Sequence, residues 1–143
     1  MERRSLPKKY RDVRRSLRVK RSAAGLGLYT EAEIEKGGFV IEYAGPIRGA
    51  AEIRGMRCKY LFETSSRRFV DGSPRWNLAR YINHSCSPNC VVRILRGRIY
   101  VFAKRRICAG EELAYNYGRA YFAEFIAPDG CRCGKCIGTV SSV

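Results

Sequence analysis

Apolar residues in this chain occur in short segments divided by glycines and charged residues, and long helical runs are absent. Such segments are typical of strands. We expect strands at Gly25–Tyr29 and Phe39–Tyr43. The clearest hairpin joins Val91–Leu95 to Arg98–Ala103 across Arg96-Gly97, with an alternation that leaves arginines on the outward face. The pattern therefore predicts a mainly β protein.

Weaker signals complete the predicted order of elements. In chain order they are a helical turn at Glu52–Arg57, a hairpin of Lys59–Glu63 with Phe69–Val70 across Ser65–Arg68, a short helix at Asn77–Ile82, and a turn and strand within Ile107–Tyr117. We expect small β-sheets with few short helices.

Length and composition limit the chain to about one domain. Its 143 residues, of which 45% are hydrophobic, are enough to bury a single core. The longest apolar runs are a few residues, far short of the roughly 20 that span a bilayer, so no membrane contact is expected. No secretory segment follows Met1. We expect a monomer in a reducing compartment, not secreted: cytoplasmic if bacterial, nuclear if eukaryotic.

Positive charge is concentrated at the start of the chain. Residues 1–21 hold ten Lys or Arg residues against Glu2 and Asp12, which is more than half of the net charge of +15. This basic N-terminal tail is expected either to contact nucleic acid or chromatin, or to be a solvated leader. An organellar targeting peptide is a third interpretation.

Four cysteines are candidates for one metal site. Cys86 follows the only histidine, His84, and Cys131, Cys133 and Cys136 come together later in the chain. The trio is too tightly spaced for internal disulfides of good geometry, whereas three thiolates and one remote partner suit a tetrahedral structural zinc site. The remaining cysteines, Cys58, Cys90 and Cys108, are expected to be structural.

Several motifs in a fixed order give the chain its strongest resemblance. They are Gly25-Leu26-Gly27-Leu28, Glu42-Tyr43-Ala44-Gly45, Tyr60-Leu61-Phe62, Asn83-His84-Ser85-Cys86, Gly110 to Gly118 and the cysteine trio. With them the chain resembles the SET-domain protein lysine methyltransferases. The resemblance implies a SET-domain fold at 22–118, with a C-terminal pseudoknot that brings the Asn83 and Tyr117 stretches together. It also implies a zinc-pinned post-SET segment at 119–143.

The resemblance further implies S-adenosylmethionine as cosubstrate and a protein substrate with a target lysine. Tyr117 is implied as the catalytic tyrosine, and Tyr43, Tyr81 and Tyr115 as walls of the lysine channel. Tyr115 is also implied to influence catalysis, and its hydroxyl suggests mono- or dimethylation. The implied cofactor contacts are Ala24, Gly25, Leu26, Gly27, Leu28, Tyr60, Arg80, Asn83, His84, Tyr117 and Arg132.

The implied zinc ligands are Cys86, Cys131, Cys133 and Cys136. Their spacing here is Cys-x-Cys-x2-Cys, shorter than the usual Cys-x-Cys-x4-Cys of the family.

Two functions remain open from the sequence. The first is methylation of lysine side chains in a histone or another nucleic-acid-associated basic protein. A lysine amine with an ordinary pKa of about 10.4 must lose its proton first, and a narrow aromatic channel favours that loss by desolvation. The alternative is a non-catalytic basic zinc module that binds nucleic acid or chromatin. The pairing of Tyr117 with Asn83 and His84 favours the enzyme, because zinc binding alone does not need it.

Overall fold

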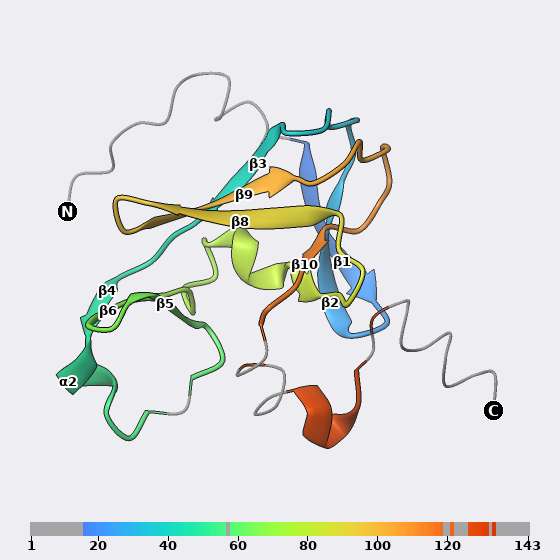
Figure 1. Ribbon diagram of the computed structural model, residues 1–143. Coiled ribbons are helices and arrows are strands. Elements are labelled where there is room, and N and C mark those ends of the chain that lie inside the picture. The colour runs from blue at the N-terminus through green and yellow to red at the C-terminus, as the bar shows by residue number, and fades with distance from the viewer. Residues whose placement is uncertain (1–15, 57, 119–120, 122–125, 132, 134–143) are drawn as a thin grey trace.

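The computed structural model describes residues 16–56, 58–118, 121, 126–131 and 133. Over these residues the chain forms short strands in small sheets, with little helix (Figure 1). The elements are β1 (Leu17–Ser22), β2 (Gly25–Thr30), β3 (Phe39–Tyr43), β4 (Ile47–Gly49), α2 (Ala50–Ile53), β5 (Leu61–Ser65), β6 (Arg68–Asp71), the 3-10 helix η1 (Leu78–Tyr81), β7 (Asn83–His84), β8 (Cys90–Leu95), β9 (Arg98–Ala103), β10 (Ala114–Tyr115) and the 3-10 helix η3 (Ala127–Asp129). The predicted mainly β class is confirmed.

The sheet β3-β9-β8 carries the centre of the core. Ile99 and Val101 of β9 are fully buried, as are the neighbouring Val40, Ile82 and Leu113. The predicted β8–β9 hairpin is confirmed, and Arg96 and Gly97 at its turn both have positive φ angles, 51° and 75°. That pairing of angles matches the twist of two flanking strands, so the turn itself favours the hairpin.

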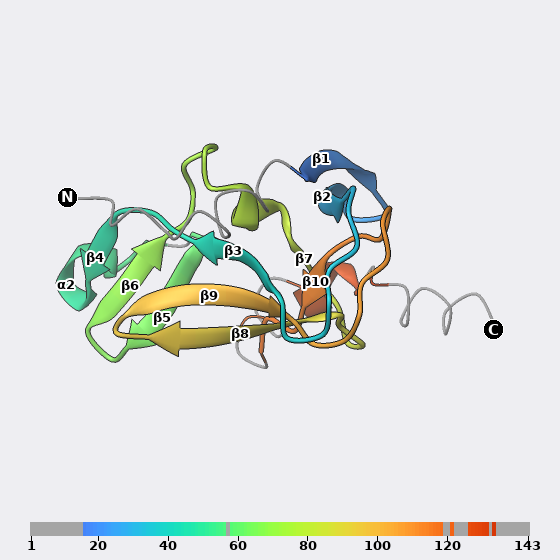
Figure 2. The ribbon, with the colours of Figure 1, turned by 90° about the horizontal axis from the view of Figure 1, so that it is seen from above.

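The second sheet, β4-β6-β5, lies at one end of the molecule together with α2, and the β1–β2 hairpin lies at the other (Figure 2). The predicted hairpin of β5 with β6 is confirmed. The helix is displaced from its predicted position at Glu52–Arg57, because the Gly49 N–H donates to the Glu52 carboxylate at 3.2 Å. This contact makes Glu52 a residue of the first helical turn, so the helix begins earlier.

Strand β1 overlaps the basic N-terminal tail predicted at residues 1–21. Leu17 is buried, with 3% of its surface exposed, and every residue of β1 pairs with β2. The cations of this strand therefore occupy the exposed positions of a hairpin, and the folded chain begins before Ser22.

A two-residue parallel pair connects distant parts of the chain. Ala114 of β10 lies opposite Asn83 of β7, and Tyr115 lies opposite His84. The two motif segments thus lie side by side, as the resemblance implies. Among the described residues, no helix has the length and apolar character needed to cross a membrane.

Candidate active site and thiol cluster

The β7–β10 pair fixes the backbone around Tyr117. The N–H of Ser85 donates to the Tyr115 carbonyl at 3.1 Å, and the N–H of Tyr117 donates to Nδ1 of His84 at 3.0 Å. Burial lowers the pKa of His84 below its ordinary value, so its ring is neutral at pH 7. With Nδ1 accepting a hydrogen bond, the ring proton is on Nε2. His84 therefore acts as a neutral positioning group for the Tyr117 backbone.

The Tyr117 hydroxyl is turned into the protein, where it donates to the Ile82 carbonyl. Its ring lies 4.8 Å from that of Tyr115, 4.8 Å from that of Tyr121 and 5.5 Å from that of His84, measured between centroids. Burial, followed by the neighbouring Tyr115, raises the pKa of Tyr117 well above 10. The hydroxyl is thus protonated at neutral pH and can donate, accept or orient, but cannot serve as a base.

Other tyrosines complete an aromatic cluster. Tyr43 is 5% exposed and donates its hydroxyl to the Tyr60 carbonyl at 2.7 Å, and its pKa is raised by burial and then by Tyr117 and Tyr121. Tyr115 is 6% exposed, and its pKa is raised by burial and then by Tyr43. Burial also raises the pKa of Tyr121 to about 12. The cluster is therefore an uncharged, largely desolvated wall.

The predicted site residue Arg80 lies against two aromatic rings, those of Tyr60 and Tyr81. The guanidinium of Arg80 lies 4.3 Å from the ring centroid of Tyr60 and 5.3 Å from that of Tyr81. Its Nε is buried with no hydrogen-bond partner among the described residues. Tyr81 packs against the same hydrophobic core as Tyr117. A buried N–H donor without an acceptor costs folding free energy unless a bound molecule accepts its hydrogen bond.

The Asn83 side chain contacts both Leu26, in the predicted cofactor motif, and Glu112, which precedes β10. Its amide nitrogen lies 2.8 Å from the Leu26 carbonyl, 2.8 Å from Oε2 of Glu112 and 3.1 Å from Oγ of Ser22. The Tyr29 hydroxyl lies 3.4 Å from the other oxygen of Glu112. These contacts bring Glu112 and Ser22 next to the predicted cofactor residue Asn83, a placement that the sequence alone does not indicate.

The Gly-x-Gly segment approaches these groups closely. A Cβ added to Gly27 would lie 2.4 Å from Oε2 of Glu112, so only glycine fits without moving the carboxylate. Gly25 has a φ of 111°, a conformation that favours glycine. Ala24 is exposed, and its N–H donates to Ser22 at 3.2 Å. Leu28 is fully buried and Leu26 is half exposed, at 51%, so the segment anchors one side chain and presents another.

The thiols of Cys86 and Cys131 lie close to each other and to the ring of His84. The Sγ atoms of Cys86 and Cys131 lie 4.0 Å apart, and Nε2 of His84 lies 3.3 Å from Cys86. All three ligand atoms lie within 4.8 Å of one another. The sulfur separation is far longer than the roughly 2.05 Å of a disulfide, and close to the value of about 3.8 Å for two thiolates on one tetrahedral zinc ion.

Two predicted zinc ligands, Cys133 and Cys136, are not part of this three-residue group. Cys133 is buried, at 8% exposure, and lies outside the group of His84, Cys86 and Cys131. Cys136 and the predicted cofactor contact Arg132 lie outside the described residues. Tyr121 could not be predicted as part of the cluster, because its isolated position beyond Tyr117 belongs to no motif.

Comparisons with known proteins identify relatives of this chain. The SET domain family model matches residues 25–118. The chain is 45% identical over 105 residues to the histone-lysine N-methyltransferase trr of Drosophila melanogaster, covering 65% of this chain and 4% of that protein. It is 36% identical over 138 residues to an H3 lysine-36 specific histone-lysine N-methyltransferase of Chaetomium globosum, covering 85% of this chain and 15% of that protein. The chain thus spans a small part of the length of these curated relatives.

Among solved structures, a chain of the Polycomb Repressive Complex 2 of Chaetomium thermophilum, in an autoinhibited conformation bound to S-adenosylmethionine, superposes with a TM-score of 0.65. It is 34% identical, and the match covers 72% of this chain and 15% of that one. The motif order, the β7–β10 pairing and these matches lead to one conclusion: the chain belongs to the SET-domain family.

Proposed function

We propose that this protein transfers the methyl group of S-adenosylmethionine to the side-chain amine of a lysine in a protein substrate. The observation that carries the proposal is the protonated Tyr117 hydroxyl, held inside an uncharged tyrosine cluster next to the Asn83 and Leu26 contact. When bound, the cosubstrate supplies an electrophilic methyl group. The residues of this chain then have to align the amine with it and keep the amine unprotonated.

The tyrosine cluster suits the second task. Tyr43, Tyr115 and Tyr117 are neutral over the working pH range, so they offer no anion that would stabilise an ammonium ion. Burying the lysine side chain against them therefore lowers the pKa of its amine, and the released proton goes to water. As the amine nitrogen forms its bond to the methyl carbon, the carbon–sulfur bond breaks. Tyr81 is proposed as a further wall, and the Tyr115 hydroxyl limits room to mono- or dimethylation.

The Gly25–Leu28 segment and Asn83 fit the cosubstrate by their chemistry. With its amide nitrogen directed at Leu26 and Glu112, Asn83 retains an Oδ1 acceptor that no described residue uses. A cationic amino group suits an amide oxygen and a neighbouring carboxylate. We therefore assign Asn83 and Glu112 to the amino end of the cosubstrate, and the exposed Leu26 to an apolar contact. Ala24, Tyr60, Arg80, His84 and Arg132 are proposed to line the same site.

Zinc is proposed as a structural ion held by Cys86, Cys131, Cys133 and Cys136, and the 4.0 Å sulfur separation supports this ligand set. His84 is the rival fourth ligand. Because its Nδ1 accepts the Tyr117 N–H, coordination through Nε2 would engage both ring lone pairs and require an imidazolate. The neutral ring instead donates from Nε2 to the Cys86 sulfur, as an outer partner of the site.

The test of the ion is direct measurement of zinc in the purified protein. We expect one equivalent in the wild type, a loss in Cys86→Ser, and retention in Cys90→Ser, whose buried thiol lies in the core. A full equivalent in Cys86→Ser would contradict this ligand set. Far-ultraviolet circular dichroism of each variant controls for folding.

The substrate is proposed to be a histone or another nucleic-acid-associated basic protein, because the matched relatives carry histone-lysine names. Those relatives come from a fly and a fungus, which supports a nuclear protein and not the bacterial alternative.

The experiment is transfer of a labelled methyl group to histones and to nucleosomes, with mass spectrometry of the modified lysine. The control is Tyr117→Phe. Absence of transfer, together with absence of cosubstrate binding by calorimetry, would favour the non-catalytic zinc module instead.

A further inference from the structure

One face of the β3-β9-β8 sheet points away from the core and is not used by the proposed chemistry. Residues directly opposite in an antiparallel pair point to the same side. Val91 lies opposite Phe102, Arg93 opposite Tyr100, and Leu95 opposite Arg98. The alternate residues of β9 are buried on the other side. The outward face therefore combines apolar, aromatic and cationic side chains with the carboxylate of Glu42, which lies opposite Tyr100.

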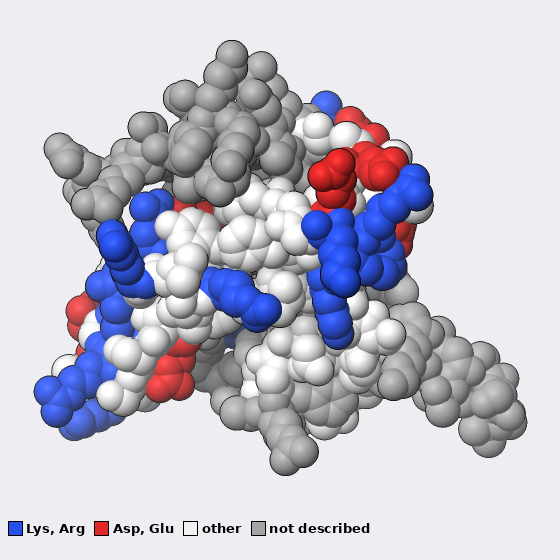
Figure 3. All heavy atoms as spheres, turned by 45° about the horizontal axis from the view of Figure 1, so that its top comes forward, with Lys and Arg blue, Asp and Glu red and all other residues white. Residues whose placement is uncertain are grey.

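A shallow groove of about 580 Å³ lies on this face. Its lining includes three exposed cations, Lys36, Arg93 and Lys104, above an apolar floor of Val91, Leu95 and Phe102. No carboxylate is among the described residues that line it. Figure 3 shows Lys and Arg side chains spread over this side of the molecule, with acidic side chains gathered toward its margins.

The arginines beside the groove are paired with carboxylates, whereas the three groove cations have no carboxylate partner among the described residues. Arg98 binds Glu42 through two hydrogen bonds of 3.0 and 2.6 Å. Arg105 binds Glu111 at 2.8 Å, and Arg106 binds Glu33 at 2.6 Å. No salt bridge within the described part of the chain involves Lys36, Arg93 or Lys104. Their charge is therefore available to a partner.

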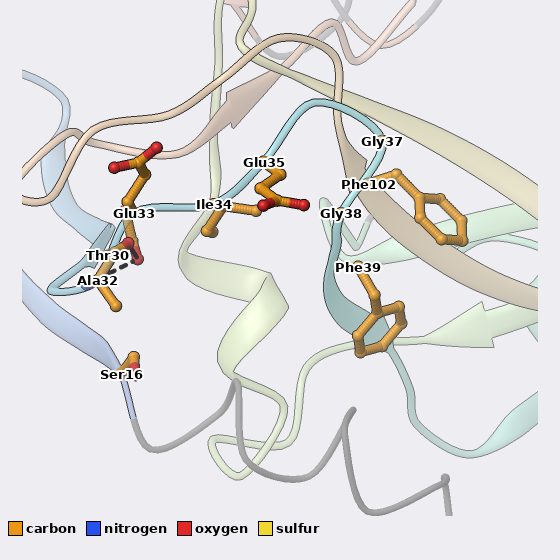
Figure 4. A pocket seen from close by; sticks show the side chains of 10 residues that line it. All are labelled: Ser16, Thr30, Ala32, Glu33, Ile34, Glu35, Gly37, Gly38, Phe39 and Phe102. Carbon is orange, nitrogen blue, oxygen red and sulfur yellow. Dashed lines mark hydrogen bonds between the residues drawn. The ribbon is translucent and has the colours of Figure 1, made fainter.

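Glu33 and Glu35 belong to a separate hollow, whereas Glu42 lies opposite Tyr100 on the outward face and is paired with Arg98. This hollow, of about 410 Å³, shares Gly37 and Phe102 with the groove and contains Glu33 and Glu35 (Figure 4). Phe102 thus stands between a hollow with carboxylates and a groove with cations. A polyanion in the groove would contact its cations, and the neighbouring Glu42 carboxylate is already paired with Arg98.

We propose that this groove binds the phosphate backbone of double-stranded DNA. The aromatic rings of the face pack against one another, because the Phe39 ring centroid lies 5.9 Å from that of Phe102 and 6.3 Å from that of Tyr100. Rings engaged in this way are poorly placed to stack on single-stranded bases, which is the usual mode of single-strand binding. Exposed Lys and Arg side chains are the usual contacts to phosphate.

Such binding would resolve a charge conflict in the proposed function. A chain with a net charge of +15 repels a free basic peptide, whereas DNA on the groove supplies negative charge and keeps both proteins on one polyanion. The proposal about the groove does not depend on methyl transfer, since the test below needs no cosubstrate.

The test is fluorescence anisotropy of a short labelled duplex with the full chain over a series of salt concentrations. The triple variant Lys36→Gln/Arg93→Gln/Lys104→Gln is compared with Arg54→Gln/Arg67→Gln/Arg75→Gln. The second set removes the same charge from three exposed arginines that lie outside the groove. Each phosphate contact contributes about 0.9 to the slope of log affinity against log salt.

We expect the groove variant to lower this slope by about 2 to 3, with an affinity loss on the order of 100-fold near 0.1 M salt, and the control to change it by less than about 1. Lys104→Gln alone should lower the slope by about 1, so the result does not rest on the triple variant. Equal losses in the two triple variants would overturn the proposal, since only overall charge would then matter. Equal affinity for a single strand would also overturn it.

Discussion

The tyrosine cluster and the cationic groove lie on opposite sides of the same sheet region and differ in how they are stabilised. The cluster is buried, uncharged and hydrogen bonded to backbone carbonyls of Ile82 and Tyr60. The groove is open and charged, and it is positioned by the register of β8 with β9 and by the packing of Phe102 on Phe39. A buried neutral site depends on exact placement and little on salt, whereas an exposed cationic surface depends on charge and strongly on salt.

Removing one hydroxyl from the tyrosine cluster should have the greatest consequence for activity. Tyr117→Phe keeps the ring and its contacts at 4.8 Å but loses the group that donates to Ile82. We expect turnover to fall by roughly 100-fold or more, the range for loss of one positioned catalytic donor, with cosubstrate affinity nearly unchanged. Methyl-transfer kinetics and calorimetry on the same preparation measure both quantities.

The control for this variant is Tyr100→Phe, which removes a hydroxyl from the outward face of β9. That change should leave turnover within about 2-fold of the wild type. Comparable turnover by Tyr117→Phe and the wild type would move the catalytic role to another residue.

A smaller effect on cosubstrate affinity is expected from a change at Gly27, where the backbone lies close to the Glu112 carboxylate. Gly27→Ala would place a methyl group 2.4 Å from Oε2 of Glu112, the oxygen that contacts Asn83, and Oε1 of the same carboxylate lies near the Tyr29 hydroxyl. The carboxylate must move and break these contacts, so we expect cosubstrate affinity to fall about 10-fold, equivalent to roughly 1.4 kcal/mol. Calorimetry of cosubstrate binding checks this.

Gly49→Ala is the matched control, because the nearest atom to its added Cβ would be 3.7 Å away, which is ordinary contact. DNA affinity should stay unchanged in both variants. If Gly27→Ala bound the cosubstrate as tightly as the wild type, the Gly25–Leu28 segment would not be part of the cosubstrate site.

The two regions were not equally predictable from the sequence. The β8–β9 hairpin follows from local alternation and from Arg96-Gly97, so its register also predicts the outward arginines. The β7–β10 pair is only two residues long in each strand, which is too short for any periodic signal. Its partners lie about thirty residues apart, and only the motif order associates them.

Other misses have equally physical causes. In β1, apolar Leu17 and Val19 alternate with cations, a period-two pattern that the high charge of the segment obscures. Glu112 lies in a Gly-Glu-Glu turn, where one carboxylate cannot be distinguished from the next by sequence. In the folded chain Glu111 binds Arg105, whereas Glu112 faces Asn83. Tertiary contacts alone separate their roles.

Alkaline pH offers a further test of the difference between the neutral tyrosine cluster and the charged groove. Burial raises the pKa of Tyr115 well above 10, whereas tyrosines of the unfolded chain ionise near 10. A group whose pKa is raised on folding contributes its full stability below the unfolded pKa and loses that contribution as pH rises toward the folded one. The free energy of unfolding should therefore fall above about pH 10, by about 1.4 kcal/mol per pH unit for each such tyrosine.

Tyr115→Phe should reduce that slope by one tyrosine's share, measured by denaturant unfolding at several pH values and constant salt. Arg93→Gln on the outward face should leave the slope as in the wild type, because it changes no buried phenol. Equal slopes in the wild type and Tyr115→Phe would mean that this hydroxyl ionises as readily in the folded chain as in the unfolded one. The tyrosine wall would then carry negative charge at alkaline pH and stabilise a lysine ammonium ion, so the neutral, desolvated site proposed for the amine depends on this result.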